Sequence, residues 1–302
     1  MNHFARPCLH RLAALLVAAA TFALAPNSAS AQCDPSLVPP DTLRLGANDQ
    51  ILFFGDSISR RFGKPKIRPA HYARTFQRIL TDTYCDCADI VVSSTGRIGH
   101  NYRTYQRRIK RRLSRKNAPE YDWVIVQDAG RAVRNDFLAP GVAGTIAGAR
   151  EALPNANVVL ATTPPLDRPR ASRGALRRYT DAEDFGPFND TVEQIAATMG
   201  AEVMPWSVDA CSCYSRDPGF DATKPDFNFR WTFDGIHPLP HGELVMALSA
   251  LKHFGVPREH LNLTNLWKVD DAFNLTTVET IADWVYSAAD WAVVPPAPCP
   301  LD

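Results

Sequence analysis

The sequence predicts an α/β protein in which helices cover both faces of a parallel β-sheet. Five short apolar segments alternate along the chain with segments of helical periodicity. The apolar segments are rich in β-branched residues and do not alternate with polar ones, which is typical of strands buried on both faces. The composition, 45% hydrophobic and 22% charged, is that of a folded protein, and 302 residues are enough to form a large core.

Five apolar runs are the predicted strands, of which the last is the weakest. They occupy residues 51–54, 90–92, 123–126, 158–161 and 202–204. The clearest helix is 102–113, because its apolar side chains recur at spacings of three and four. The other predicted helices are 70–80, 144–153, 188–199, 244–254 and 278–291, and the polar, arginine-rich segment 164–187 is predicted to be a long surface loop.

The N-terminal segment has the pattern of a secretory signal peptide. Residues 1–11 carry Arg6 and Arg11 and no acid, and residues 12–25 are an apolar run that is short for a membrane span. The small residues 29–31 then suit a signal peptidase, which predicts cleavage before Gln32. We therefore expect a signal peptide over 1–31, a secreted or periplasmic protein, and a single domain over 32–302 that ends in a helical extension from about residue 260.

Six cysteines remain after that cleavage. An exported chain with six cysteines is expected to form disulfides, although fifteen pairings are possible. The two C-x-C pairs could also bind a soft metal, but the C-x₂-C spacing typical of zinc sites is absent, so no metal is expected. The six are Cys33, Cys85, Cys87, Cys211, Cys213 and Cys299.

The charge of the chain is balanced overall but uneven along its length. The formal net charge is +1, which excludes a protein that binds polyanions through its overall charge. Basic residues nevertheless outnumber acidic ones sixteen to three over residues 60–116, and they are densest from Arg103 to Lys116. This stretch is either the solvated polar face of a helix or a contact for an anionic surface, such as lipid headgroups or acidic polysaccharide. Nucleic acid is not expected to be the partner of an exported protein.

Two small motifs directly follow the first two predicted strands. Ser57 lies in the turn 55–59 that leaves the first strand, which places its hydroxyl at the mouth of the sheet. Gly96 follows the second strand, and its N–H could donate a hydrogen bond to a developing oxyanion. Either motif alone is also the ordinary composition of a turn.

A third motif, an Asp–His pair, precedes a late helix. A serine hydroxyl is a weak nucleophile until a base removes its proton, and His237 can be that base. Asp234 lies three residues earlier and can orient the imidazole and stabilise its cation. A metal site made of Asp234, His237 and His241 is the alternative, which Pro238 and Pro240 disfavour because they prevent one regular helix from presenting both histidines.

Together these motifs resemble the SGNH/GDSL hydrolase family over roughly residues 51–254. The resemblance implies a three-layer α/β/α sandwich around a five-stranded parallel sheet, the flavodoxin-like SGNH fold. It implies Ser57 as nucleophile, His237 as general base and Asp234 as its partner, with no cofactor. It also implies an oxyanion hole that includes the N–H groups of Ser57 and Gly96.

One departure from the family pattern concerns the third oxyanion donor. The family places Gly-x-Asn directly after its third strand, whereas residues 127–131 here read Gln-Asp-Ala-Gly-Arg. Asn135 comes about four residues late. A shifted loop could deliver Asn135, or Gln127 or Arg131 could substitute for the missing asparagine. Loss of one such donor typically lowers the rate by about 10²–10³.

The sequence therefore favours an exported serine esterase that acts through an acyl-enzyme, with a carbohydrate O-acyl ester or a small lipid ester as substrate. Two alternatives use the same scaffold. One is a catalytically silent module that binds an anionic glycan or envelope surface through Arg103 to Lys116. The other is an acyltransferase that delivers the acyl group to a glycan instead of water.

Overall fold

The structure is a computed structural model that describes residues 37–60, 71–87, 89–128, 135–164, 186–216, 231–232 and 237–288. By its contacts the chain divides into Met1–Ser30 and Ala31–Asp302, and every described residue belongs to the second unit. Most of the predicted loop 164–187 lies outside the described residues. Within the described ranges, no helix is both long and apolar enough to cross a membrane.

The predicted parallel sheet is confirmed, with five strands in the spatial order β2-β1-β3-β4-β5. All four strand pairs are parallel. Each predicted strand agrees with an observed one to within a few residues. The strands are β1 (Gln50–Gly55), β2 (Val91–Gly96), β3 (Trp123–Gln127), β4 (Asn157–Ala161) and β5 (Glu202–Met204).

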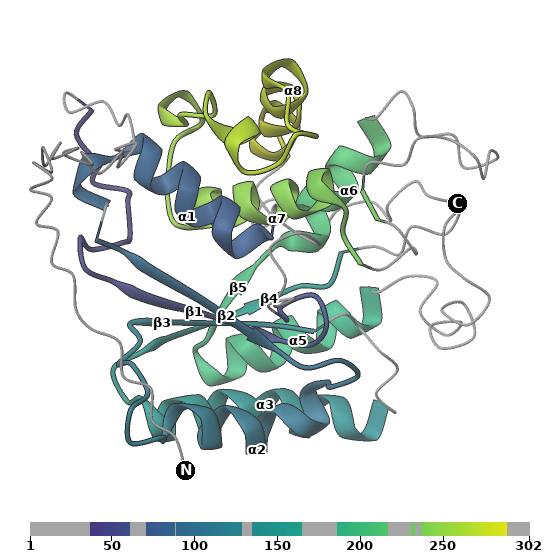
Figure 1. The fold of residues 1–302 in the computed structure, drawn as a ribbon. Helices are drawn as coiled ribbons and strands as arrows, with labels where there is room; N and C mark the ends of the chain where they lie inside the picture. Colours follow the sequence, from purple (N-terminus) through teal and green to yellow (C-terminus); the bar gives the residue numbers. More distant parts are fainter. Residues whose placement is uncertain are drawn as a thin grey trace, which may run out of the picture. The chain divides into compact units, whose positions relative to one another are not determined.

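Helices cover both faces of the sheet, as Figure 1 shows. One face packs against α1 (Tyr72–Thr83), α6 (Trp206–Arg216) and α7 (Pro240–His253). The other packs against α2 (Tyr102–Leu113), α3 (Asn135–Ala152) and α5 (Gly186–Met199). Alternate residues of one strand supply the two cores, since Phe53 belongs to the first and Phe54 to the second. This alternation explains why the strands are apolar throughout.

Two helices differ from the sequence prediction. Helix α3 begins at Asn135 rather than at residue 144, so that Pro140 lies inside it. Helix α6 was not predicted, because its serines, cysteines and aspartate are weak helix formers. The close packing of α2 on α3 explains one glycine of α3: a β-carbon on Gly141 would lie 2.9 Å from the backbone carbonyl carbon of Tyr102.

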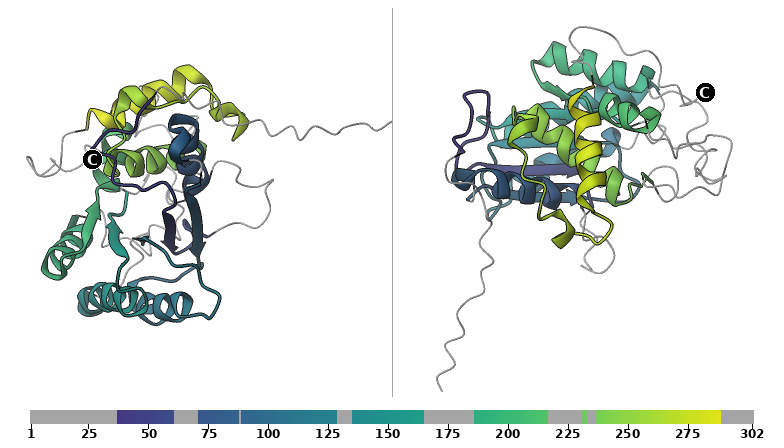
Figure 2. Two further views of the ribbon diagram at one scale, coloured as in Figure 1. Left: turned by 90° about the vertical axis from the view of Figure 1, so that its left-hand side faces the viewer. Right: turned by 90° about the horizontal axis from the view of Figure 1, so that it is seen from above.

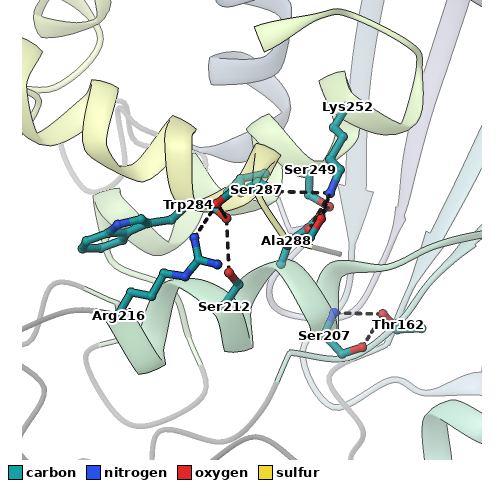
Figure 3. A network of polar contacts seen from close by, with 11 residues as sticks. Thr162, Ser207, Ser212, Arg216, Ser249, Lys252, Trp284, Ser287 and Ala288 are labelled. Carbon is teal, nitrogen blue, oxygen red and sulfur yellow. Dashed lines mark hydrogen bonds and ion pairs between the residues drawn. The ribbon is translucent and has the colours of Figure 1, made fainter. Parts of the chain in front are cut away.

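The C-terminal extension packs on α6 and α7. It consists of the short helices η3 (Arg258–His260) and η4 (Leu266–Lys268), followed by α8 (Leu275–Tyr286). Figure 3 shows the polar network that fixes the end of α8. Nζ of Lys252, on α7, donates to the carbonyls of Val285 and Ala288, both at 3.1 Å. Ser212, on α6, donates to the carbonyl of Trp284 at 3.2 Å. Trp291 lies outside the described residues.

Two of the predicted disulfide cysteines are buried thiols. They are Cys87, in the short helix η1 (Cys85–Cys87), and Cys213, on α6. Their exposed fractions are 2% and 0%. Burial at this level protects a thiol from solvent oxidants, so each C-x-C pair contains one protected sulfur.

Candidate active site

Ser57 lies in a compact loop at the carboxyl end of β1. Oδ1 of the preceding Asp56 accepts a hydrogen bond from the N–H of Ile58 at 2.8 Å, which closes a tight turn around Ser57. Asp56 and Ser57 are both buried, with exposed fractions of 3% and 9%. A turn braced in this way limits the positions that the serine hydroxyl can take.

Gly96, at the end of β2, lets this loop approach the neighbouring strand. A β-carbon at position 96 would lie 1.9 Å from the carbonyl oxygen of Asp56 and 2.5 Å from the backbone nitrogen of Arg60. Real β-carbons do not come so close to backbone atoms, so only glycine fits here. The two predicted motifs are therefore in direct contact through their backbones.

His237 contacts the loop 56–60, which we call the nucleophile loop because it carries the predicted nucleophile Ser57. Its Nε2 lies 2.9 Å from Oγ of Ser57, although the two residues are 180 positions apart in the sequence. The loop that carries His237 is closed at its base. Thr232 and Pro238 form an antiparallel bridge, and the N–H of Leu239 donates to the carbonyl of Trp231 at 2.6 Å.

Asp234 and two candidates for the third oxyanion donor are not described by the structure. Asp234 belongs to the segment 233–236, and Arg131 to the segment 129–134. Asn135 is the first residue of α3, but its side chain is also outside the described set. No described residue accepts a hydrogen bond from the N–H of Ser57. An oxyanion donor must have its N–H available in this way.

The residues at the end of β3 serve other contacts. The side chain of Gln127 is fully buried, and its Oε1 accepts a hydrogen bond from the Ser59 hydroxyl at 3.0 Å. Asp128 accepts a hydrogen bond from the N–H of Tyr102 at 2.8 Å, which holds the start of α2. Gln127 thus holds the nucleophile loop through Ser59, and its buried side chain does not face a substrate.

A buried polar cluster beneath Ser57 was missed by the sequence analysis. The hydroxyl of Tyr72, on α1, donates to Oγ of Ser59 at 2.8 Å, and Ser94 donates to the carbonyl of Ser59 at 2.7 Å. Burial raises the pKa of Tyr72, so its phenol stays a donor. The available signal was Gln127, a polar residue at the end of the otherwise apolar strand β3.

His100 stands in the turn between Gly96 and α2. Its Nδ1 lies 3.2 Å from the guanidinium of Arg108 and 3.1 Å from Oγ1 of Thr104. Because a guanidinium only donates, Nδ1 must accept and the proton resides on Nε2. Burial, followed by the charges of Arg108 and Arg97, lowers the pKa of His100 and keeps it neutral.

Among the described residues, no group of three His, Cys, Asp or Glu side chains is arranged to hold a metal ion.

The fold is that of an SGNH-type hydrolase. A model described as the GDSL-like Lipase/Acylhydrolase family matches residues 53–244, more than half of the chain. The protein therefore belongs to that family, as its motifs predicted.

Several solved structures are similar to the chain. No curated protein matches the chain. A GDSL-like lipase from Parabacteroides merdae is 16% identical, covers 71% of this chain and 99% of its own, and has a TM-score of 0.52. A lipase/acylhydrolase from Enterococcus faecalis is 16% identical, with 68% and 94% covered and a TM-score of 0.44. A carbohydrate acetylesterase from Sinorhizobium meliloti is 14% identical, with 68% and 97% covered and a TM-score of 0.44.

Proposed function

We propose that the protein is an exported serine ester hydrolase that works through an acyl-enzyme on Ser57. The observation that carries this proposal is the 2.9 Å contact between Oγ of Ser57 and Nε2 of His237. At this distance the hydroxyl proton can pass to the imidazole as the oxygen attacks. Membership of a family of lipases and acylhydrolases points to the same chemistry.

Acylation begins when Oγ of Ser57 attacks the ester carbonyl carbon and its proton moves to Nε2 of His237. The carbonyl oxygen gains the negative charge, and the N–H groups of Ser57 and Gly96 are the proposed donors that stabilise it. Collapse of this intermediate breaks the bond to the alcohol oxygen, which takes the proton back from Nε2. Asp234 has the proposed role of holding the imidazolium in place.

Deacylation repeats the sequence with water as the nucleophile. Nε2 of His237 takes a proton from the water as its oxygen attacks the acyl carbon. The ester bond to Ser57 then breaks, Oγ regains the proton, and the carboxylic acid leaves. If a glycan hydroxyl enters in place of water, the same residues perform acyl transfer. The substrate class that we propose is a carbohydrate O-acyl ester or a small lipid ester.

The test is hydrolysis of p-nitrophenyl acetate by the purified mature protein. We expect Ser57→Ala to abolish turnover, and we expect a fluorophosphonate probe to add one adduct, located on Ser57 by peptide mapping. The matched control is Ser114→Ala, an exposed serine at the end of α2, which should keep wild-type activity. Equal activity of Ser57→Ala and wild type would overturn the assignment of the nucleophile.

Export is the second part of the proposal. The pattern of residues 1–31 supports it, and the buried thiols of Cys87 and Cys213 confine disulfide formation to the other four cysteines. We propose that Cys33, Cys85, Cys211 and Cys299 are oxidised in the mature protein. N-terminal sequencing should then begin at Gln32, and thiol labelling after unfolding should count two thiols per chain. An intact N-terminus with seven thiols, Cys8 included, would contradict export.

A further inference from the structure

One face of α2 presents a row of basic side chains to solvent. Arg103, Arg107 and Arg111 are exposed and follow one another at intervals of four residues. Residues at this spacing are neighbours on a helix surface, so the row spans about 12 Å along the helix axis. We call these three residues the arginine ridge.

The described acidic residues do not neutralise the ridge. Lys110 pairs with Glu151 at 2.5 Å, but among the described side chains, which do not include that of Asp136, no carboxylate forms an ion pair with Arg103, Arg107 or Arg111. Like charges at a spacing of four destabilise a helix. A bound polyanion would remove this repulsion.

The ridge starts at the edge of the sheet that carries Ser57. The turn from Arg97 to His100 joins Gly96 to α2, with the His100 N–H donating to the Arg97 carbonyl at 3.1 Å. The first N–H of α2, that of Tyr102, is held by Asp128 at the end of β3. Figures 1 and 2 show α2 beside α3, running back from this edge along the sheet.

The turn itself offers hydrogen-bond donors. Arg97 is exposed and directly follows Gly96. His100 is half-buried, and its contact with Arg108 fixes the proton on Nε2, so that this nitrogen donates. The turn 97–100 leads directly into α2, and we call its donors and the arginine ridge together the basic path.

We propose that this path binds an O-acylated acidic polysaccharide and presents its ester groups to Ser57. The inference rests on the proposed function and names its substrate class. The partner must carry both repeated anions, to match the ridge, and carboxylic esters, to match the site. Membrane-binding helices place apolar side chains beside their basic ones, whereas the exposed positions of α2 are all basic. Phe137, on α3, is partly covered by the Arg103 guanidinium at 4.4 Å.

The experiment compares three substrates: acetylated polygalacturonate, acetylated xylan as its neutral counterpart, and p-nitrophenyl acetate. The ridge variant is Arg107→Gln/Arg111→Gln. The matched control is Arg74→Gln/Lys268→Gln, which removes two exposed charges, from α1 and η4, on the opposite side of the sheet. All three proteins are the full mature chain, and acetate release gives kcat/KM at low and high salt.

We expect the ridge variant to lose about tenfold in kcat/KM on acetylated polygalacturonate, with a similar loss for the wild type in 0.5 M salt. Its activity on p-nitrophenyl acetate and acetylated xylan should stay at the wild-type level, as should all activities of the control. Equal kcat/KM of ridge variant and wild type on the acidic polymer would overturn the proposal. A uniform loss on all three substrates would do the same.

A failure of the esterase proposal can be distinguished from a failure of the ridge proposal. If the wild type does not hydrolyse p-nitrophenyl acetate, the esterase proposal fails. Binding to unacetylated polygalacturonate, measured by calorimetry, still tests the ridge. Binding that the ridge variant lacks supports the path, and its absence from the wild type overturns it. Binding to vesicles of anionic phospholipid but not to the polymer would also overturn it.

Discussion

The hydroxyl of Ser59 donates a hydrogen bond to Oε1 of Gln127 at 3.0 Å and thereby joins the nucleophile loop to the end of β3. The same oxygen of Ser59 accepts a hydrogen bond from Tyr72 at 2.8 Å. All three side chains are fully buried. Ser57 is two residues away from this anchor, so the cluster determines where the nucleophile stands.

Ser59→Ala should therefore lower kcat on p-nitrophenyl acetate. The substitution leaves the Tyr72 hydroxyl and the Gln127 amide oxygen without their partner, which costs about 1–3 kcal/mol of folding free energy. A displaced nucleophile loop should reduce kcat by about tenfold or more, with KM little changed. Urea unfolding and steady-state kinetics measure the two effects.

Tyr72→Phe is a milder substitution in the same cluster. It removes only one hydrogen bond and keeps the contact between Ser59 and Gln127, so both losses should be smaller, with about 1 kcal/mol of stability lost. A Ser59→Ala enzyme with wild-type kcat would show that the cluster supports the fold alone.

Much of the fold could be predicted because its signals are local. The strands are apolar throughout, and the stripe of Tyr102, Tyr105, Ile109 and Leu113 defines α2 to the residue. Helix α6 could not be predicted, since its polar residues are held by tertiary contacts such as that of Ser212 with α8. Local propensity does not contain such contacts.

The candidate site likewise contains residues that could be predicted from the sequence and residues that could not. Ser57 and His237 could be chosen because serine and histidine carry recognisable chemistry and stand at predicted strand and helix ends. The anchor of Ser59, Tyr72 and Gln127 could not, because these side chains meet only when β1, α1 and β3 are packed together. Their sequence separations carry no periodic signal.

Gly96→Ala tests the contact between the two loops at the strand ends. The new β-carbon would lie 1.9 Å from the carbonyl of Asp56, so the nucleophile loop must move. Because the loop carries Ser57 and one proposed oxyanion donor, we expect kcat/KM on p-nitrophenyl acetate to fall by about 10² or more. Thermal unfolding should also show a loss of stability.

Gly200→Ala is the matched control for that variant. Gly200 has a φ of 64°, and a β-carbon there would meet no atom within 4 Å. The left-handed backbone alone should cost about 1–2 kcal/mol of stability, while activity at 25 °C should be retained. If both variants lose activity in proportion to stability, Gly96 has no special role in the site.

Glu202→Gln should change how stability depends on pH. Glu202, on β5, lies 3.2 Å from Nε2 of His253 and 2.5 Å from Arg44. The hydrogen bond from His253, followed by that from Arg44, lowers the pKa of Glu202 from 4.5 to about 2 despite partial burial. A lowered pKa means that the carboxylate stabilises the fold above about pH 4.5, and that this contribution is lost as the pH falls toward 2.

The expected result is a difference between wild type and Glu202→Gln in urea midpoint that is present at pH 7 and shrinks between pH 4.5 and pH 2.5. Taking the difference cancels the titration of the other carboxylates. Glu120→Gln, at an exposed position, is the control and should show no such trend. A difference that stays constant with pH would mean that the charge of Glu202 contributes nothing.

Lys252→Met tests the attachment of the C-terminal helix. Nζ of Lys252 lies 3.3 Å from Oδ1 of Asp209, whose side chain is almost fully buried and also accepts a hydrogen bond from Ser249. Methionine keeps the length of the side chain but removes the positive charge that Lys252 places beside the buried Asp209 carboxylate, which costs about 3 kcal/mol. The carbonyls of Val285 and Ala288 lose the same donor.

We expect Tm of Lys252→Met to fall by roughly 6–12 °C, with turnover of p-nitrophenyl acetate at 25 °C unchanged. Asp209→Asn combined with Lys252→Met should recover part of the loss, because both members of the buried ion pair are then neutral. A double variant no more stable than Lys252→Met would show that the ion pair with Asp209 does not account for the lost stability.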